Sequence, residues 1–143
     1  MSCFLECKSG WTFFGHTGKC YKSFKTGVTR ADAFRVCKGS VPNANLVSIS
    51  DLKTNEFVRS IMKVSKNWIA LEKKNSKWIW PDGSENLLKN WFPGNPSGDG
   101  SFVEINAGPG LWNDLGLTWR GRANLRGSMC QYDPPKTEST EGF

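Results

Sequence analysis

Apolar positions along the chain change their spacing twice, which separates helical from strand-like segments. In residues 29–40 (TRADAFRVCKGS) and 50–63 (SDLKTNEFVRSIMK), apolar residues recur every three or four positions and predict two amphipathic helices. Thr29 and either Ser50 or Asp51 are the predicted N-caps, because a short polar side chain there accepts a hydrogen bond from a free backbone N–H group. The residues expected on the buried faces are Ala33, Phe34 and Cys37 in the first helix, and Leu52, Phe57, Val58 and Ile61 in the second.

Strand-like segments precede and follow these helices. Residues 7–24 predict a hairpin, because aromatic residues lie on both sides of the turn-forming sequence His16–Lys19. The other strand candidates are NLVSIS (45–50), NWIALEK (67–73), KWIWPDGS (77–84, with a turn at Pro81–Gly83), LWND (111–114) and LRGSMCQY (125–132). Strands, two helices and then further strands predict one α+β domain.

A long loop region, residues 90–110, interrupts the second group of strands. It is rich in Gly, Pro and Asn, and no Lys or Arg occurs from Asn90 through Trp119. Asp99, Glu104 and Asp114 lie in that same window, in a chain whose formal net charge is +6. The window is therefore a local acidic region in a basic protein.

Five cysteines and a single histidine limit the chemistry of the chain. No CxxC pair occurs, which excludes a zinc finger. The sequence also shows no nucleophile paired with a base, so we do not expect an enzyme. Five Cys in 143 residues instead favour an oxidised extracellular domain with two disulfide bonds and one spare thiol. Four paired cysteines allow three connectivities, and the count alone does not choose among them.

Charge and hydropathy bear on partners and location. A pI near 9.2 permits polyanion binding, and Arg120, Arg122 and Arg126 form the densest basic run, for which a solvated surface loop is the favoured explanation. No nucleic-acid-binding fingerprint accompanies this run. No apolar run reaches membrane-spanning length and no signal peptide is visible at the start of the chain, so we expect no membrane insertion.

The order of these motifs resembles that of a C-type lectin-like domain of the long form, over residues 7–132. The pieces that carry the resemblance are CKSGWTFF, ADAFRVC, NLVSIS, NEFV, WIAL, WIWPDGS, NWFPGNP, FVEI, LWND and MCQY. The resemblance implies the C-type lectin fold, in which two helices flank small antiparallel sheets beside a long irregular loop region. Residues 1–6 would then be an N-terminal extension and residues 133–143 a flexible tail or linker.

The same resemblance implies a disulfide pattern and shows where the chain departs from it. Cys7 is expected to pair with Cys20 and Cys37 with Cys130, which leaves Cys3 spare and able to pair between chains. Phe102 and Leu117 occupy the places of the family's inner disulfide, and an apolar contact between them is expected instead. The chain is thus identified as a divergent or invertebrate-type member that lacks the inner disulfide.

Calcium-dependent members of this family hold Ca²⁺ with the long loop and the Asn-Asp of the WND motif. The residues of this chain that match that site are Asn95, Ser97, Asp99, Asn113 and Asp114. Asn95-Pro96-Ser97 stands where the family has a Glu-Pro-Asn type of signature, and Pro96 is expected to be cis. At most two carboxylates remain, which predicts a weak Ca²⁺ site, because affinity rises with ligand charge. The alternative is that Asn113 and Asp114 are structural.

The function implied is a secreted, extracellular carbohydrate-binding module whose partner is a glycan or glycoprotein. Its ligand is expected at Asn95, Asp99, Asn113 and Asp114, with Trp119 as the exposed aromatic ring. The alternative is a calcium-independent lectin-like domain that binds a protein or a sulfated glycan through Arg120, Arg122 and Arg126. The core aromatic residues are expected to be Trp68, Trp78, Trp80, Trp91 and Trp112. No nucleic-acid partner is expected, and the oligomeric state is left open.

Overall fold

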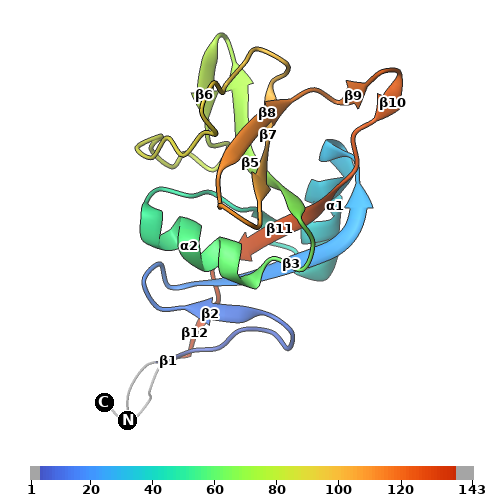
Figure 1. The fold of residues 1–143 in the computed structure, drawn as a ribbon. Coiled ribbons are helices and arrows are strands. Elements are labelled where there is room, and N and C mark those ends of the chain that lie inside the picture. The colour runs from blue at the N-terminus through green and yellow to red at the C-terminus, as the bar shows by residue number, and fades with distance from the viewer. Residues whose placement is uncertain (1–3, 138–143) are drawn as a thin grey trace.

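The computed structural model describes residues 4–137, which fold as an α+β domain (Figure 1). The helices are α1 (Arg30–Ser40) and α2 (Leu52–Ile61). The strands are β1 (Phe4–Leu5), β2 (Thr12–Phe14), β3 (Lys19–Val28), β4 (Asn45–Leu46), β5 (Lys66–Lys74), β6 (Lys77–Ile79), β7 (Phe102–Asn106), β8 (Trp112–Leu115), β9 (Thr118–Trp119), β10 (Arg122–Ala123), β11 (Arg126–Tyr132) and β12 (Lys136–Thr137).

The main sheet contains strands from both the start and the end of the domain. Its strands lie in the order β2-β3-β11-β5-β7-β8, with β4 paired to β11 and β6 paired to β5. All pairings in it are antiparallel except β11 with β5, where Gly127 pairs with Asn67. The helices lie beside the β3–β11 part of this sheet, and the β5–β7–β8 part extends away from them (Figure 1). The loop before β7 and the β9–β10 hairpin after β8 flank the β7–β8 pair in sequence, and both are largely exposed.

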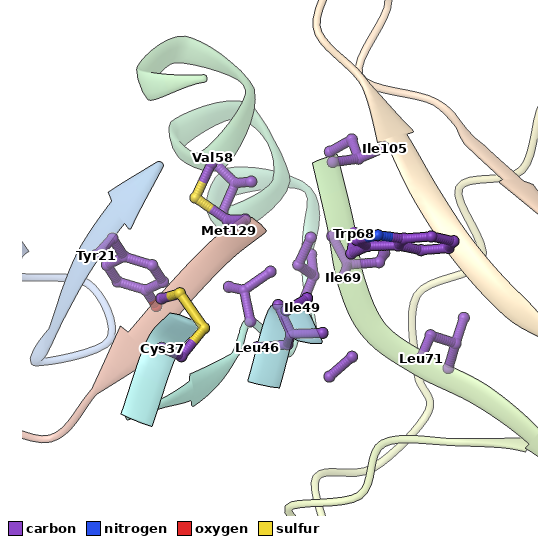
Figure 2. Packing of buried hydrophobic residues seen from close by; sticks show 14 of the residues in the cluster. Tyr21, Cys37, Leu46, Ile49, Val58, Trp68, Ile69, Leu71, Ile105 and Met129 are labelled. Atoms are coloured by element: carbon purple, nitrogen blue, oxygen red, sulfur yellow. A yellow bond between two sulfur atoms is a disulfide. The ribbon is translucent and has the colours of Figure 1, made fainter. Parts of the chain in front are cut away.

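Large apolar side chains from both helices and the central strands form the core. Figure 2 shows Tyr21 of β3, Val58 of α2 and Met129 of β11 around the sheet, with Trp68 and Ile69 of β5 beyond them. The centre of β5 is buried on both faces, which explains its nearly unbroken apolar sequence WIAL. Trp68, Trp80 and Trp112 are buried and Trp78 and Trp91 are partly buried against the core, as the sequence predicted.

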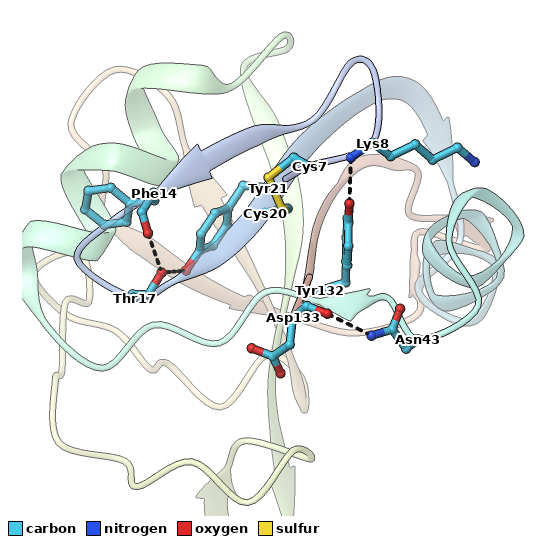
Figure 3. The surroundings of a disulfide bond; sticks show 9 residues. All are labelled: Cys7, Lys8, Phe14, Thr17, Cys20, Tyr21, Asn43, Tyr132 and Asp133. Atoms are coloured by element: carbon cyan, nitrogen blue, oxygen red, sulfur yellow. Dashed lines mark hydrogen bonds between the residues drawn. A yellow bond between two sulfur atoms is a disulfide. The ribbon is translucent and has the colours of Figure 1, made fainter. Parts of the chain in front are cut away.

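Both predicted disulfides are present. Cys7 is bonded to Cys20 at the start of the domain, and Cys37 of α1 is bonded to Cys130 of β11. Near the first bond, the Lys8 backbone N–H donates to the Tyr132 hydroxyl at 2.7 Å, so the N-terminal hairpin is also held to the end of β11 (Figure 3). The Phe4–Leu5 strand of the expected extension pairs with Lys136–Thr137 of the expected tail, whereas Cys3 and residues 138–143 lie outside the described chain.

The helix N-caps are those predicted, but the buried face of α2 differs. The hydroxyl of Thr29 accepts from the Asp32 N–H at 3.2 Å, and the Asp51 carboxylate accepts from the Thr54 N–H at 2.8 Å. Leu52 is 60% exposed, so its expected burial is wrong, and Asn55 is buried instead. Asn55 is buried because its amide donates to the Gly110 carbonyl and accepts from the Trp112 indole, which joins α2 to β8.

Two other local predictions need correction. The strand expected over residues 45–50 ends at Leu46, although the Val47 N–H still donates to the Met129 carbonyl at 2.9 Å. Leu117 is 54% exposed, so it does not form the apolar core contact with Phe102 that was expected to replace the inner disulfide. Phe102 instead lies beside the Arg30 guanidinium, 5.1 Å from its ring centre.

Candidate functional site

The loop before β7 folds back onto strand β8 and forms one wall of the candidate site. The Asn95–Pro96 peptide bond is cis, as predicted. The Asn95 side-chain amide donates to the side-chain oxygen of Asn113 at 2.8 Å. Gly100 lies so close to the backbone of Leu115 that an added Cβ would come within 2.1 Å of its carbonyl carbon. No side chain fits there, so this position must remain glycine in this conformation.

Asp114 is the anchor of this loop. It is only 1% exposed, and its carboxylate accepts from the backbone N–H groups of Ser97 and Gly98, each at 2.9 Å. The Ser97 hydroxyl lies 3.2 Å from the same carboxylate. Burial by itself raises the pKa of Asp114, but these hydrogen bonds outweigh it and hold the pKa below its ordinary value. Asp114 therefore fixes residues 97–98 as an internal hydrogen-bond acceptor.

Glu104 is a member of the site that the sequence reasoning did not assign. It is 1% exposed on β7, directly opposite Asn113 of β8, and accepts from the Asn113 amide at 3.2 Å. The Arg126 guanidinium donates to the other carboxylate oxygen of Glu104. The Lys66 ammonium lies 3.8 Å from the oxygen that Asn113 contacts. A buried carboxylate requires such partners, because an unpaired charge away from water is strongly destabilising. The FVEI motif located Glu104, but nothing local in the sequence paired it with Arg126.

Several of the expected Ca²⁺ ligands are already hydrogen-bonded within the protein. Ca²⁺ takes six to eight oxygen ligands with net negative charge. Here both oxygens of Asp114 accept hydrogen bonds from the loop, and the Asn113 side chain is held between Asn95 and Glu104. The guanidinium of Arg126 already balances the charge of Glu104. Within residues 4–137 no group of three or more His, Cys, Asp or Glu side chains that could hold a metal ion is found.

A cavity of about 300 Å³ opens beside this network, and Asp99, Asn113, Asp114, Leu115, Gly116, Thr118, Trp119, Asn124 and Arg126 line it. Trp119 is 62% exposed, as predicted, and the Arg120 guanidinium lies 5.3 Å from its ring centre. The structure thus brings four predicted residues, Asp99, Asn113, Asp114 and Trp119, to one cavity. Asn95 and Ser97 hold its wall by hydrogen bonds.

The three arginines of the expected basic patch have different surroundings. Arg120 and Arg122 are exposed on the β9–β10 hairpin, whereas Arg126 is paired with Glu104 and lines the cavity. Thr118 and Asn124 are cavity residues that the sequence reasoning missed. The Asn124 backbone N–H donates to the Leu117 carbonyl and its side chain donates to the Gly116 carbonyl, so this hairpin closes against the end of β8.

The depressed pKa of Asp114 leads to a prediction about acid stability. The pKa of Asp114 in the folded protein lies below the unfolded value of about 3.9. The ionised carboxylate therefore contributes its full stabilisation of the folded state above that pH, and this contribution is lost as the pH falls through the folded pKa. Asp114→Asn is expected to lower the free energy of unfolding by about 2 kcal/mol at neutral pH, because it removes hydrogen bonds to a charged group. Urea unfolding at neutral pH and at about pH 3 or below checks this. A gap between the two proteins that does not shrink in acid contradicts it.

Comparison with known proteins places the chain in a family. The family model described as the lectin C-type domain matches residues 26–123. The C-type lectin lectoxin-Lio3 of Erythrolamprus poecilogyrus is 35% identical over 122 residues, which cover 76% of this chain and 73% of that protein. Asialoglycoprotein receptor 2 of Rattus norvegicus is 32% identical over 117 residues, which cover 76% of this chain and 38% of the receptor. This chain therefore spans well under two thirds of the receptor it matches.

Solved structures agree on the fold. A calcium-independent type II antifreeze protein matches with a TM-score of 0.78 and 23% identity, covering 92% of this chain and 98% of the other, a likeness that concerns the fold alone. This chain belongs to the C-type lectin family and has its α+β fold. Of the helices in residues 4–137, neither is long and apolar enough to cross a membrane.

Proposed function

We propose that this C-type lectin domain binds carbohydrate in the cavity beside Trp119 and that it does so without calcium. The observation that carries the proposal is an exposed indole ring at the mouth of a cavity lined by polar side chains. Ligand sites in proteins combine apolar surface with a few polar groups that fix orientation. The apolar face of a sugar ring fits the indole, and its hydroxyls fit the polar wall.

The polar wall supplies both kinds of hydrogen-bonding group. Asp99 offers an exposed carboxylate that accepts from sugar hydroxyls, whereas Thr118 offers a hydroxyl that donates or accepts. Arg126 is fixed by Glu104 and brings a cation to the same cavity. Because Asn113 and Asp114 are occupied by internal hydrogen bonds, we assign them the role of holding the wall rather than that of binding metal.

One relative supports a glycoprotein ligand, because it is named as an asialoglycoprotein receptor. Two disulfide bonds also fit an oxidising compartment, so we propose a secreted, extracellular protein with a glycan or glycoprotein partner. The proposal includes no catalytic step. Pairing between chains through Cys3 stays a prediction, which electrophoresis under non-reducing conditions would test.

Glycan-array binding with a calorimetric follow-up tests the proposed site. Trp119→Ala is expected to weaken binding of the glycan identified on the array by about tenfold or more, because a large aromatic contact surface is lost. Phe13→Ala, which removes an exposed ring from the N-terminal hairpin, is the matched control and should leave binding unchanged. Binding should also be the same with Ca²⁺ and with a chelator. Loss of binding in the chelator, with a melting temperature that rises on adding Ca²⁺, would show the calcium-free proposal to be wrong.

A further inference from the structure

Two further hollows are lined in part by Lys or Arg, and one of them shares a lining residue with the Trp119 cavity. The first has a volume of about 480 Å³ and includes Lys22, Lys25 and Lys63 in its lining. The second, of about 390 Å³, is lined in part by Lys25, Lys66 and Arg126. The two hollows share Lys25, and the second shares Arg126 with the Trp119 cavity. No Asp or Glu lines either hollow, so the charge along this basic row of hollows is of one sign.

Strand pairing brings these lysines together from distant parts of the chain. β3 ends beside the start of β11, where Val28 pairs with Arg126, and β11 is parallel to the start of β5. Lys63, which follows α2, is held beside β3 because its backbone N–H donates to the Ser23 hydroxyl at 2.9 Å. Lys25, Lys63 and Lys66 are exposed, and neither Lys25 nor Lys63 forms an ion pair with any described residue. The ammonium groups of Lys25 and Lys63 are thus available to a ligand, whereas that of Lys66 lies 3.8 Å from the Glu104 carboxylate.

We propose that this basic row of hollows binds a linear sulfated polysaccharide, at a site that adjoins the Trp119 cavity at Arg126. A sulfated polysaccharide carries anionic groups at intervals along its rigid sugar rings. This spacing suits cations that are distributed along consecutive hollows. The lining of the first hollow includes Val28 and Val36, and apolar surface of this kind suits the less polar faces of sugar rings. The second hollow shares Arg126 with the cavity that we assign to carbohydrate.

Two other polyanions fit this surface less well. A membrane offers a flat array of charges, whereas the cations here line concave hollows. Single-stranded nucleic acid binds by stacking its bases on open aromatic rings. The ring of Phe24 is covered by the Lys22 ammonium, which lies 4.9 Å from its centre, so it does not offer a free stacking face.

Binding of size-defined heparin oligosaccharides, measured by calorimetry over a range of salt concentrations, tests the inference. Lys25→Gln/Lys63→Gln is expected to weaken binding by about tenfold and to reduce its dependence on salt, because two charge contacts are lost. The control is Lys74→Gln/Lys77→Gln at the β5–β6 hairpin, which removes the same charge from exposed positions and should bind like the unmodified protein. Chemically desulfated heparin should bind far more weakly than the sulfated form.

Other outcomes overturn the proposal. Equal losses in both double variants would show that only net charge matters, and equal binding of desulfated heparin would show that sulfates are not recognised. Tighter, Lys25- and Lys63-dependent binding to phosphatidylserine vesicles or to single-stranded RNA would assign the row to those ligands. Trp119→Ala should retain heparin binding while losing the array glycan, so failure of this inference and failure of the proposed function are distinguishable.

Discussion

Removal of the Cys37–Cys130 bond, as Cys37→Ser/Cys130→Ser, is expected to lower the free energy of unfolding by about 4–5 kcal/mol. The bond closes a loop with a sequence separation of 93, and in the chain-entropy description a cross-link restricts the unfolded chain more as its loop lengthens. It also joins α1 to β11 inside the core, where both sulfurs are fully buried. Denaturant unfolding under non-reducing conditions measures the loss.

The Cys7–Cys20 bond provides the matched comparison. Its sequence separation is 13, so Cys7→Ser/Cys20→Ser is expected to cost about 3 kcal/mol by the same reasoning. The hydrogen bond from Lys8 to Tyr132 remains and continues to hold the hairpin to β11 (Figure 3). A larger loss for the short loop than for the long one would show that the loop-entropy argument does not govern this fold.

Arg126→Met is expected to lower the free energy of unfolding by about 3 kcal/mol. It leaves the buried Glu104 carboxylate with only the Asn113 amide and the more distant Lys66 ammonium, and an uncompensated buried charge is strongly destabilising. The Arg126 side chain is 22% exposed, which places the estimate at the lower end of the range for buried pairs. Urea unfolding at neutral pH measures the change.

A double-mutant cycle shows whether the charge of Glu104 is the reason why Arg126→Met loses stability. Glu104→Gln/Arg126→Met should be more stable than Arg126→Met, because the neutral amide no longer needs a cation but still accepts from Asn113. Arg122→Met is the control, since Arg122 is exposed on β10 and its removal should change stability by less than about 0.5 kcal/mol. Additive effects of the two changes would mean that Glu104 and Arg126 are not coupled.

Most predictions that rest on short-range spacing agree with the structure. The two helices, their caps at Thr29 and Asp51, and the hairpin are set by residues within a few positions of one another. Both disulfides and the cis Asn95–Pro96 bond followed from the order of the family's motifs. The exposed Trp119 was predicted because it stands in an irregular, polar segment rather than in an apolar strand.

Reasoning from local spacing did not identify residues that contact one another in the fold but lie far apart in the sequence. Leu52 was expected inside from its helical position, but only the packing of α2 against β8 shows that Asn55 is buried there with Trp112. Likewise, nothing in the sequence indicated that Glu104 of the acidic window is neutralised by Arg126, which lies outside that window.

The sequence by itself determined the family, the fold, the two disulfides and the segment in which the candidate site lies. The tertiary structure alone decided what the polar residues of that segment do. Asp114 holds its own loop, Glu104 pairs with Arg126, and lysines from β3 and β5 meet beside β11. The reason is physical: helix periodicity and turn chemistry act over a few residues, whereas strand register sets which distant charges meet.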